Sequence, residues 1–257
     1  KLFWGDLHGQ SEETIGTGSA EQYFLFARDC AFLDVTSHQG NDFQMTKEFW
    51  ETLNKLSSKY TVDNEFVIIP GYEWSGNTAL GGDRNVFFPN EGRIIRRSSH
   101  AMISDQTDIE NDCHTATDLF EAFAKNNEFD VLGYAHCGGR YADINFAHDS
   151  RFEKSMEVHS SWGTFEWLVH DAFKLGLRTG IVANSDGHKG RPGASYPGAS
   201  QFGAIGGLTC FLSKSLNRQE ILKCIRNRHH YASSGGPNGR PVINLNATFS
   251  KEGILYH

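Results

Sequence analysis

Short apolar runs alternate with amphipathic stretches along most of the chain. An apolar run bounded by turn residues is typical of a buried strand, and recurrence of apolar positions at i, i+3 and i+4 is typical of a helix. The predicted strands occupy residues 1–8, 32–38, 65–74, 84–89, 129–136, 154–160, 177–186 and 206–213. The predicted helices occupy residues 19–30, 45–58 and 164–175, with two more that begin near residues 115 and 217.

The starts of those last two helices carry capping signals. Thr115 is followed three residues later by Asp118, and Asn217 by Glu220, the spacing at which a cap and its reciprocal partner satisfy free backbone N–H groups. About seven strand-then-helix units follow one another without a break in composition. The pattern predicts one α/β domain over residues 1–257, built as a parallel barrel or a doubly wound sheet.

Composition narrows the function classes. The chain has 257 residues, 39% of them hydrophobic, and a formal net charge of -7 with its 12 histidines neutral. This charge disfavours a protein that coats nucleic acid, although it leaves room for a local basic site on an acidic body. Five widely spaced cysteines without a CxxC pair predict neither a disulfide framework nor a cysteine-rich zinc site. No apolar stretch is long enough to predict a membrane span, and the compartment cannot be read from the sequence.

The predicted strands share one unusual feature: they end in residues whose side chains can bind metals. The stretch GIVANSDGHKG, residues 180–190, shows this best: an apolar run closes on Asp-Gly-His. Parallel strands gather their C-terminal ends at one face of an α/β fold, where ligands bind. The residues at these ends are Asp6, His8, His38, Glu73, His136, Glu157, His159, Asp186 and His188.

Two interpretations of these residues compete. A single histidine at a strand end is more often a hydrogen-bonded structural residue than a ligand, and Glu73 alone would serve equally well as a helix cap. Recurrence at six strand ends favours a metal cluster, because buried charge is costly unless it is paired or bound to a cation. Histidines with carboxylates are the donor set of Zn, Mn and Fe.

The ordered motifs resemble those of the PHP superfamily, named for polymerase and histidinol phosphatase. GDLHGQS is similar to its first motif, DVTSHQ to its Thr-Asp-His motif, and GYEW to its glycine-plus-glutamate motif. AHCGG, MEVHSS and NSDGH are similar to its later motifs, and the likeness runs from residue 2 to about residue 247. An uncharacterised branch that shares RNVFF, GTFE, SDGHKGRPG and YASSG is the most similar part of the superfamily.

The resemblance implies a distorted (β/α)7 barrel, related to the TIM barrel, whose mouth holds two or three Zn, Mn or Fe ions and hydrolyses phosphoesters. Two positions depart from the motifs: Gln10 replaces a second histidine, and Ser37 replaces an aspartate. Glu12 or Glu13 would supply a further ligand that often follows the first motif. The implied ligands are His8, Gln10, Glu13, His38, Glu73, His136, His159, Asp186 and His188.

The expected chemistry needs no serine or cysteine nucleophile, because divalent ions lower the pKa of coordinated water towards ~7 and neutralise phosphoryl oxygens. His159 would protonate the leaving oxygen if it is not a ligand. Arg140 and Arg191 follow two of the motifs and would bind phosphate, or else lie as solvated loop residues.

Three functions therefore stay open. The first is a metal-dependent phosphoesterase acting on a small phosphate ester. The second is an amidohydrolase-type metal hydrolase, which would favour a bridging lysine that no predicted strand end offers. The third is a non-catalytic metal-binding or ligand-binding barrel, which the changes at Gln10 and Ser37 allow.

Overall fold

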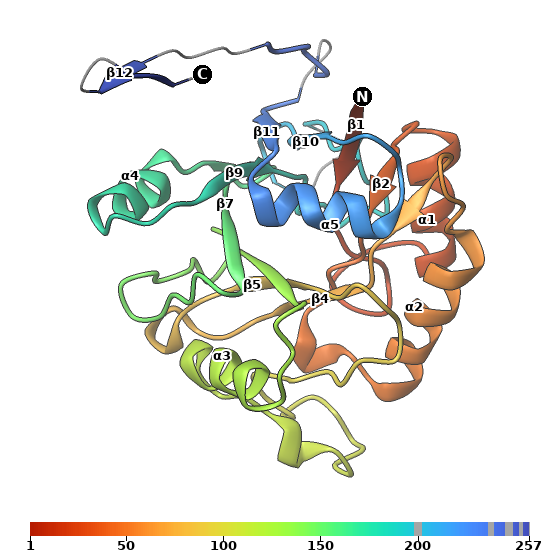
Figure 1. The fold of residues 1–257 in the computed structure, drawn as a ribbon. Helices are drawn as coiled ribbons and strands as arrows, with labels where there is room; N and C mark the ends of the chain where they lie inside the picture. Colours follow the sequence, from red (N-terminus) through yellow and green to blue (C-terminus); the bar gives the residue numbers. More distant parts are fainter. Residues whose placement is uncertain (198–201, 236–238, 245–248, 252–253, 257) are drawn as a thin grey trace.

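The apolar runs form the strands of two sheets in the computed structural model of the protein (Figure 1). The structure describes residues 1–197, 202–235, 239–244, 249–251 and 254–256. One sheet has the order β11-β10-β1-β2-β3, from β1 (Leu2–Asp6), β2 (Val35–Thr36), β3 (Val67–Ile68), β10 (Leu208–Leu212) and β11 (His230–Ser233). The other has the order β4-β5-β6-β7-β8 with β9 paired to β7, from β4 (Gly71–Trp74), β5 (Arg84–Phe87), β6 (Leu132–Ala135), β7 (Glu153–Ser160), β8 (Gly163–Thr164) and β9 (Gly180–Ala183).

Helices lie at the flanks of the two sheets. In Figure 1, α1 and α2 lie side by side at one flank and α4 lies at the other. The α-helices of the described residues are α1 (Ala20–Asp29), α2 (Lys47–Tyr60), α3 (Ala116–Lys125), α4 (Glu166–Lys174) and α5 (Arg218–Asn227). Short 3-10 turns are η1 (Asp42–Gln44), η2 (Thr78–Leu80) and η3 (Ile109–Asn111), and β12 (Phe249–Lys251) pairs with β13 (Ile254–Tyr256) as a separate hairpin.

The predicted caps are confirmed at two helices. The Thr115 side chain accepts from the backbone of Asp118, whose carboxylate accepts in return from the Thr115 N–H, so α3 begins with a full capping box. At α5, the Asn217 side chain accepts from the N–H of Glu220. These local bonds replace the partners that the first turn of a helix lacks.

The α/β class is confirmed, but the strands are not all parallel as predicted. Pairs β1/β2, β2/β3, β6/β7 and β7/β9 are parallel, whereas β4/β5, β5/β6, β1/β10 and β10/β11 are antiparallel. The predicted strand 65–74 divides into β3 and β4 around Pro70, which has no N–H to donate to a ladder. Strand β11 was not among the predicted strands.

The strand ladders of the described residues do not form a closed barrel. They make two open sheets, and isolated bridges join the sheets where the strands end. Gly9 pairs with Gly187, and Asn41 pairs with Glu73, both in parallel sense. The segment after β1 is therefore joined to the segment after β9, and the segment after β2 to β4, without a continuous ladder around the fold. No helix of the described residues is both long and apolar enough to cross a bilayer.

A buried ion pair ties β5 to β7. Arg84 Nε lies 2.7 Å from Glu153 Oε2, and the two side chains are 2% and 1% exposed. Arg84 also donates to the carbonyl of Ala147 at 2.9 Å. Breaking such a pair leaves an uncompensated buried charge, which costs about 3–5 kcal/mol.

We expect Arg84→Met to lower the free energy of unfolding by about 3–5 kcal/mol, because Glu153 would stay buried without its cation. The exposed pair of Arg151 with Asp149 offers a matched control, since Arg151→Met should cost less than about 1 kcal/mol. Urea unfolding of both variants measures the difference. Equal losses would contradict a structural role specific to the buried pair.

Candidate functional site

Three buried side chains from separate strands meet beside the bridged strand ends. His8 follows β1, Glu73 lies within β4, and His136 follows β6. One donor atom of each lies within 4.8 Å of the others. His8 Nε2 is 3.5 Å from Glu73 Oε2, and His136 Nε2 is 3.8 Å from Glu73 Oε1. This spacing matches a set of side chains that share a cation.

The loop after β9 adds two further donors to this group. Asp186 Oδ1 lies 3.2 Å from His8 Nε2, and His188 Nε2 lies 3.3 Å from Asp186 Oδ1. Asp186 has a φ of 47°, a left-handed conformation that aspartate tolerates better than most residues but that still requires support from its surroundings. Such outliers are common at functional sites. We refer to His8, Glu73, His136, Asp186 and His188 as the donor cluster.

Several imidazole nitrogens of the donor cluster are buried without a hydrogen-bond partner among the described residues. They are His8 Nε2, His136 Nδ1, His136 Nε2 and His188 Nδ1. An unpaired buried polar atom costs about 1–3 kcal/mol, so proteins rarely leave several of them together. Neutral imidazole nitrogens beside carboxylates are a usual ligand set for Zn, Mn or Fe. The residues therefore fit divalent cations.

His8 is oriented by a partner that was predicted only as a strand-end residue. Glu157 Oε1 lies 3.0 Å from His8 Nδ1, and Asn184 Nδ2 donates to Glu157 Oε2 at 2.6 Å. A carboxylate on one ring nitrogen fixes the tautomer and turns the other nitrogen towards a metal. The alternation of Glu157 and His159 on one strand gave no means of separating their roles, but an irregularity in the ladder lies between them.

Asp6 holds the two loops that carry His8 and Asp186. Its Oδ1 accepts from the N–H of Ser185 at 2.9 Å and from the N–H of His8 at 3.3 Å, and its Oδ2 accepts from Gly193 at 2.7 Å. Burial raises the pKa of Asp6 to about 6 even though these donors act in the opposite direction. Asp6 thus acts as a positioning residue for the donor cluster.

A pocket of about 280 Å³ opens onto the donor cluster. Arg140, which was selected from the sequence, and Asp83, which was not, both line it. Arg140 Nε lies 2.9 Å from Asp83 Oδ1, and its terminal nitrogen lies 3.7 Å from Glu73 Oε1. Gln10 also lines the pocket, and its amide nitrogen approaches Glu73 Oε2 at 3.5 Å. Arg140 is thus held where an anion in the pocket can reach it.

Buried negative charge dominates the electrostatics of the site. Burial disfavours the charged His8 ring, but Asp186 and Glu157 outweigh burial and hold the pKa of His8 well above its usual range. Burial and the neighbouring His8 lower the pKa of His136. The pKa of Asp83 rises well above normal through burial and the charge of Glu73. A bound cation would relieve the same excess of negative charge that draws a proton to His8.

Two of the predicted metal ligands, His38 and His159, have other partners in the structure. His38 and His159 each engage both ring nitrogens: His38 contacts Ser11 Oγ at 2.8 Å and the N–H of Gly40 at 3.2 Å, and His159 contacts Thr164 at 2.7 Å and the carbonyl of Ile205 at 2.8 Å. These bonds occupy both nitrogens of each ring, and neither residue is among those that line the pocket at the donor cluster.

Glu13 and Arg191 are exposed. The Glu13 carboxylate accepts from Ser11 and, at 3.3 Å, from the N–H of Ala20 at the start of α1. Arg191 is not among the residues that line the pocket. Glu13 was predicted from the resemblance and Arg191 from its place in the loop after a motif, and neither argument specifies the direction of a side chain.

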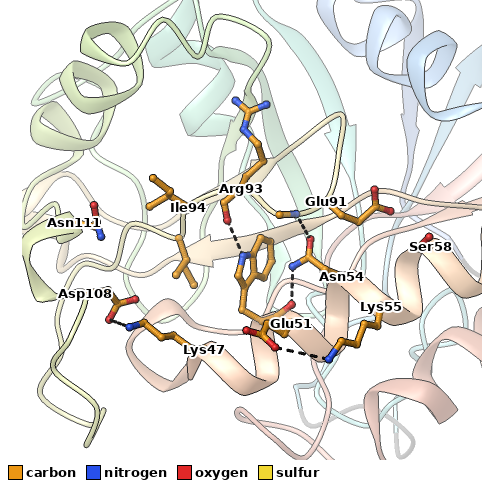
Figure 2. Close-up of a pocket in the computed structure, with 13 residues that line it drawn as sticks. Lys47, Glu51, Asn54, Lys55, Ser58, Glu91, Arg93, Ile94, Asp108 and Asn111 are labelled. Atoms are coloured by element: carbon orange, nitrogen blue, oxygen red, sulfur yellow. Dashed lines mark hydrogen bonds and ion pairs between the residues drawn. The ribbon is translucent and has the colours of Figure 1, made fainter.

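A larger groove lies away from the donor cluster. Figure 2 shows this groove, of about 690 Å³, between α2 and the segment 91–111. Its charged groups pair with one another: Lys55 lies 3.7 Å from Glu51, and Lys47 lies 3.8 Å from Asp108. Arg93 also lines the groove, and its guanidinium pairs with Asp130 at 2.9 Å. Size alone does not make it the site of chemistry.

No protein-family model matches the chain. An uncharacterised protein of Chlamydia pneumoniae is 22% identical over 275 residues, which covers 98% of this chain and 42% of that protein. An uncharacterised protein of Chlamydia trachomatis serovar D is 22% identical over 277 residues, with the same coverage. The chain spans about two fifths of the length of the curated relatives it matches.

Several solved structures have a fold similar to that of this chain. A two-domain protein of Bacteroides vulgatus, described as containing a predicted PHP-like metal-dependent phosphoesterase, matches with a TM-score of 0.60 and 14% identity over 90% of this chain and 64% of that chain. Endonuclease Q of Pyrococcus furiosus matches with a TM-score of 0.56 and 16% identity over 91% and 58%. Endonuclease Q in complex with a 27-mer duplex substrate that carries an abasic lesion gives a TM-score of 0.55.

The fold is therefore that of PHP-like metal-dependent phosphoesterases, which confirms the resemblance seen in the motifs. Sequence identities of 14–16% establish the fold alone. The assignment of activity depends on the chain's own residues.

Burial of His38 predicts a pH dependence of stability. Burial lowers the pKa of His38 from 6.5 to about 3, so between these values the unfolded chain takes up a proton that the folded chain does not. Stability from the neutral ring is therefore present above pH 6.5 and is lost as pH falls towards 3. His38→Gln removes this contribution.

The stability difference between the parent protein and His38→Gln should shift against the parent by about 2 kcal/mol between pH 7.5 and pH 5.0, or about 1.4 kcal/mol per pH unit below 6.5. Urea unfolding of both proteins in the presence of chelator measures it. A difference that does not change with pH would show that the folded protein protonates His38 readily.

Proposed function

We propose that the protein is a divalent-metal-dependent phosphoesterase that hydrolyses a phosphate mono- or diester in the pocket at the donor cluster. The supporting observation is the set of buried, unpaired imidazole nitrogens of His8, His136 and His188 beside the carboxylates of Glu73 and Asp186. The PHP-like fold supports the same class of activity.

We infer two or three ions of Zn, Mn or Fe. The five residues of the donor cluster provide enough nitrogen and oxygen donors for two ions, with Gln10 as a weaker neighbour. A third ion would require His38 or His159 to give up its present hydrogen bonds. We further propose that the two open sheets correspond to a distorted (β/α)7 barrel, in one domain over residues 1–257.

When bound, divalent ions would activate a water molecule and neutralise phosphoryl oxygens. Arg140 provides the chain's own cation for a phosphate oxygen, and Asp83 fixes its guanidinium. Cys137 adjoins His136, but burial raises the pKa of its thiol to about 12, so the thiolate that a nucleophile requires is absent near neutral pH. The geometry thus favours water as the nucleophile.

The alternatives have less support. An amidohydrolase-type site would favour a bridging lysine, and no lysine lines the pocket among the described residues. A non-catalytic binding protein would hold metal without turnover. Endonuclease Q takes a duplex substrate with an abasic lesion, but a net charge of -7 favours a small phosphate ester as the substrate of this chain.

The first test is removal of a central donor. We expect His136→Ala to lose at least one bound ion and to lower hydrolysis of a chromogenic phosphodiester or monoester by at least 100-fold, since ligand and neighbouring-shell losses typically cost 10–100-fold or more. Elemental analysis of protein purified without chelator, together with turnover under added manganese or zinc, measures both effects.

His114→Ala is the matched control, because His114 is exposed in the loop before α3 and should leave metal content and turnover unchanged. Full metal content and full turnover in His136→Ala would overturn the proposed site. Bound metal without hydrolysis of any phosphoester in the parent protein would favour the binding alternative.

Two arginines distinguish phosphate binding from surface charge. Arg140→Met should raise KM and weaken competitive inhibition by inorganic phosphate by about 10-fold or more, because a charge-assisted contact to phosphate is lost. Arg191→Met, at an exposed position, should change both by less than twofold. Steady-state kinetics measure both variants, and a larger effect at Arg191 would reverse the assignment.

A further inference from the structure

An aromatic pair forms part of the wall of the catalytic pocket, and the phosphoesterase chemistry leaves it without a role. Trp162 and Phe202 both line the pocket, with ring centroids 3.7 Å apart and ring planes 23° apart. Phe202 also contacts His188 of the donor cluster edge-on, at 5.1 Å and 82°. Trp162 is 37% exposed although it is a large apolar side chain.

Two glycines connect the aromatic pair with the donor cluster. A Cβ on Gly138 would lie 3.2 Å from Asp186 Oδ2, and a Cβ on Gly139 would lie 3.8 Å from the Trp162 ring. Both glycines line the pocket, so the indole of Trp162 and the carboxylate of Asp186 border the same cavity. A single small ligand in the pocket would contact both the ring and the donor cluster.

The other residues that line the pocket have no need of the Trp162–Phe202 pair. Glu73, Asp83 and Asp186 are acidic, and Arg140 is the cation of the pocket. None of these groups requires a stacked indole, and a phosphate alone gains nothing from one. Planar rings, however, stack on exposed aromatic faces with little regard to their substituents, and nucleobases do so in many proteins.

We propose that the substrate is a mononucleotide, whose base stacks on Trp162 while its phosphate reaches the donor cluster and Arg140. The inference rests on the proposed phosphoesterase function. A volume of about 280 Å³ suits one nucleotide, and a net charge of -7 opposes a long polyanion. The reaction is hydrolysis: a water oxygen bonds to phosphorus, the bond from phosphorus to the nucleoside oxygen breaks, and the nucleoside leaves as an alcohol with one proton from that water.

Adenosine 5'-monophosphate and ribose 5-phosphate provide the test, because they share the phosphate and the primary alcohol and differ in the base. With added manganese or zinc, kcat/KM of the parent protein should be at least 10-fold higher for the nucleotide. Trp162→Ala should lower kcat/KM for the nucleotide by about 10-fold, the effect of losing one stacked base, and change that for ribose 5-phosphate by less than twofold. Trp162→Phe should restore most of the preference.

Trp167→Ala is the matched control. Trp167 is 42% exposed on α4, packs against Tyr141 with centroids 5.6 Å apart, and does not line the pocket. It should change neither rate. Circular dichroism verifies that each variant is folded, and Trp162→Leu, which also lacks an aromatic ring, replaces Trp162→Ala in the comparison if the alanine variant unfolds.

Equal kcat/KM for the two substrates, or an equal loss for both in Trp162→Ala, would overturn the nucleotide assignment and leave the phosphoesterase intact. A strong preference for a 5'-phosphorylated oligonucleotide over the mononucleotide would overturn it as well. Absence of turnover with every phosphoester would contradict the proposed function instead. Calorimetric binding of the same two ligands would then decide on the ring site alone, and equal affinities would reject it.

Discussion

The arrangement of the site depends on one buried carboxylate, that of Asp6. It accepts hydrogen bonds from the backbone of His8, Ser185 and Gly193, and so joins the end of β1 to the loop after β9. Strand ladders alone do not make this connection, because the two sheets are joined there by an isolated bridge. Without Asp6, the loop bearing Asp186 would lose two of the contacts that orient it towards His8.

A second constraint is the excess of acidic groups in a water-poor space. Glu157 holds one nitrogen of His8 and thereby presents the other to Glu73 and Asp186. Carboxylates this close and this buried repel one another unless positive charge lies between them. The orientation of His8 and the demand for a cation therefore have the same origin. The pocket that results is small and acidic, with one arginine and one aromatic wall.

How well the sequence predicted a feature depended on how far apart along the chain the interacting residues lie. The caps of α3 and α5 and most strand positions were predicted well, because they depend on neighbours a few residues away. The parallel barrel was not, since the pairing of β4 with β5 and of β10 with β11 joins segments whose directions no local pattern specifies. Pro70 could have indicated the break between β3 and β4, because it interrupts an otherwise continuous apolar run.

By itself, the sequence determined which residue types stand at the strand ends, and so the kind of chemistry the protein can support. Only the tertiary structure decided which of them face one another. His136 and His38 follow similar apolar runs, yet the first has two unpaired nitrogens and the second is bonded to Ser11 and Gly40. The difference arises because hydrogen-bond partners come from other loops, whose approach depends on the packing of the whole fold.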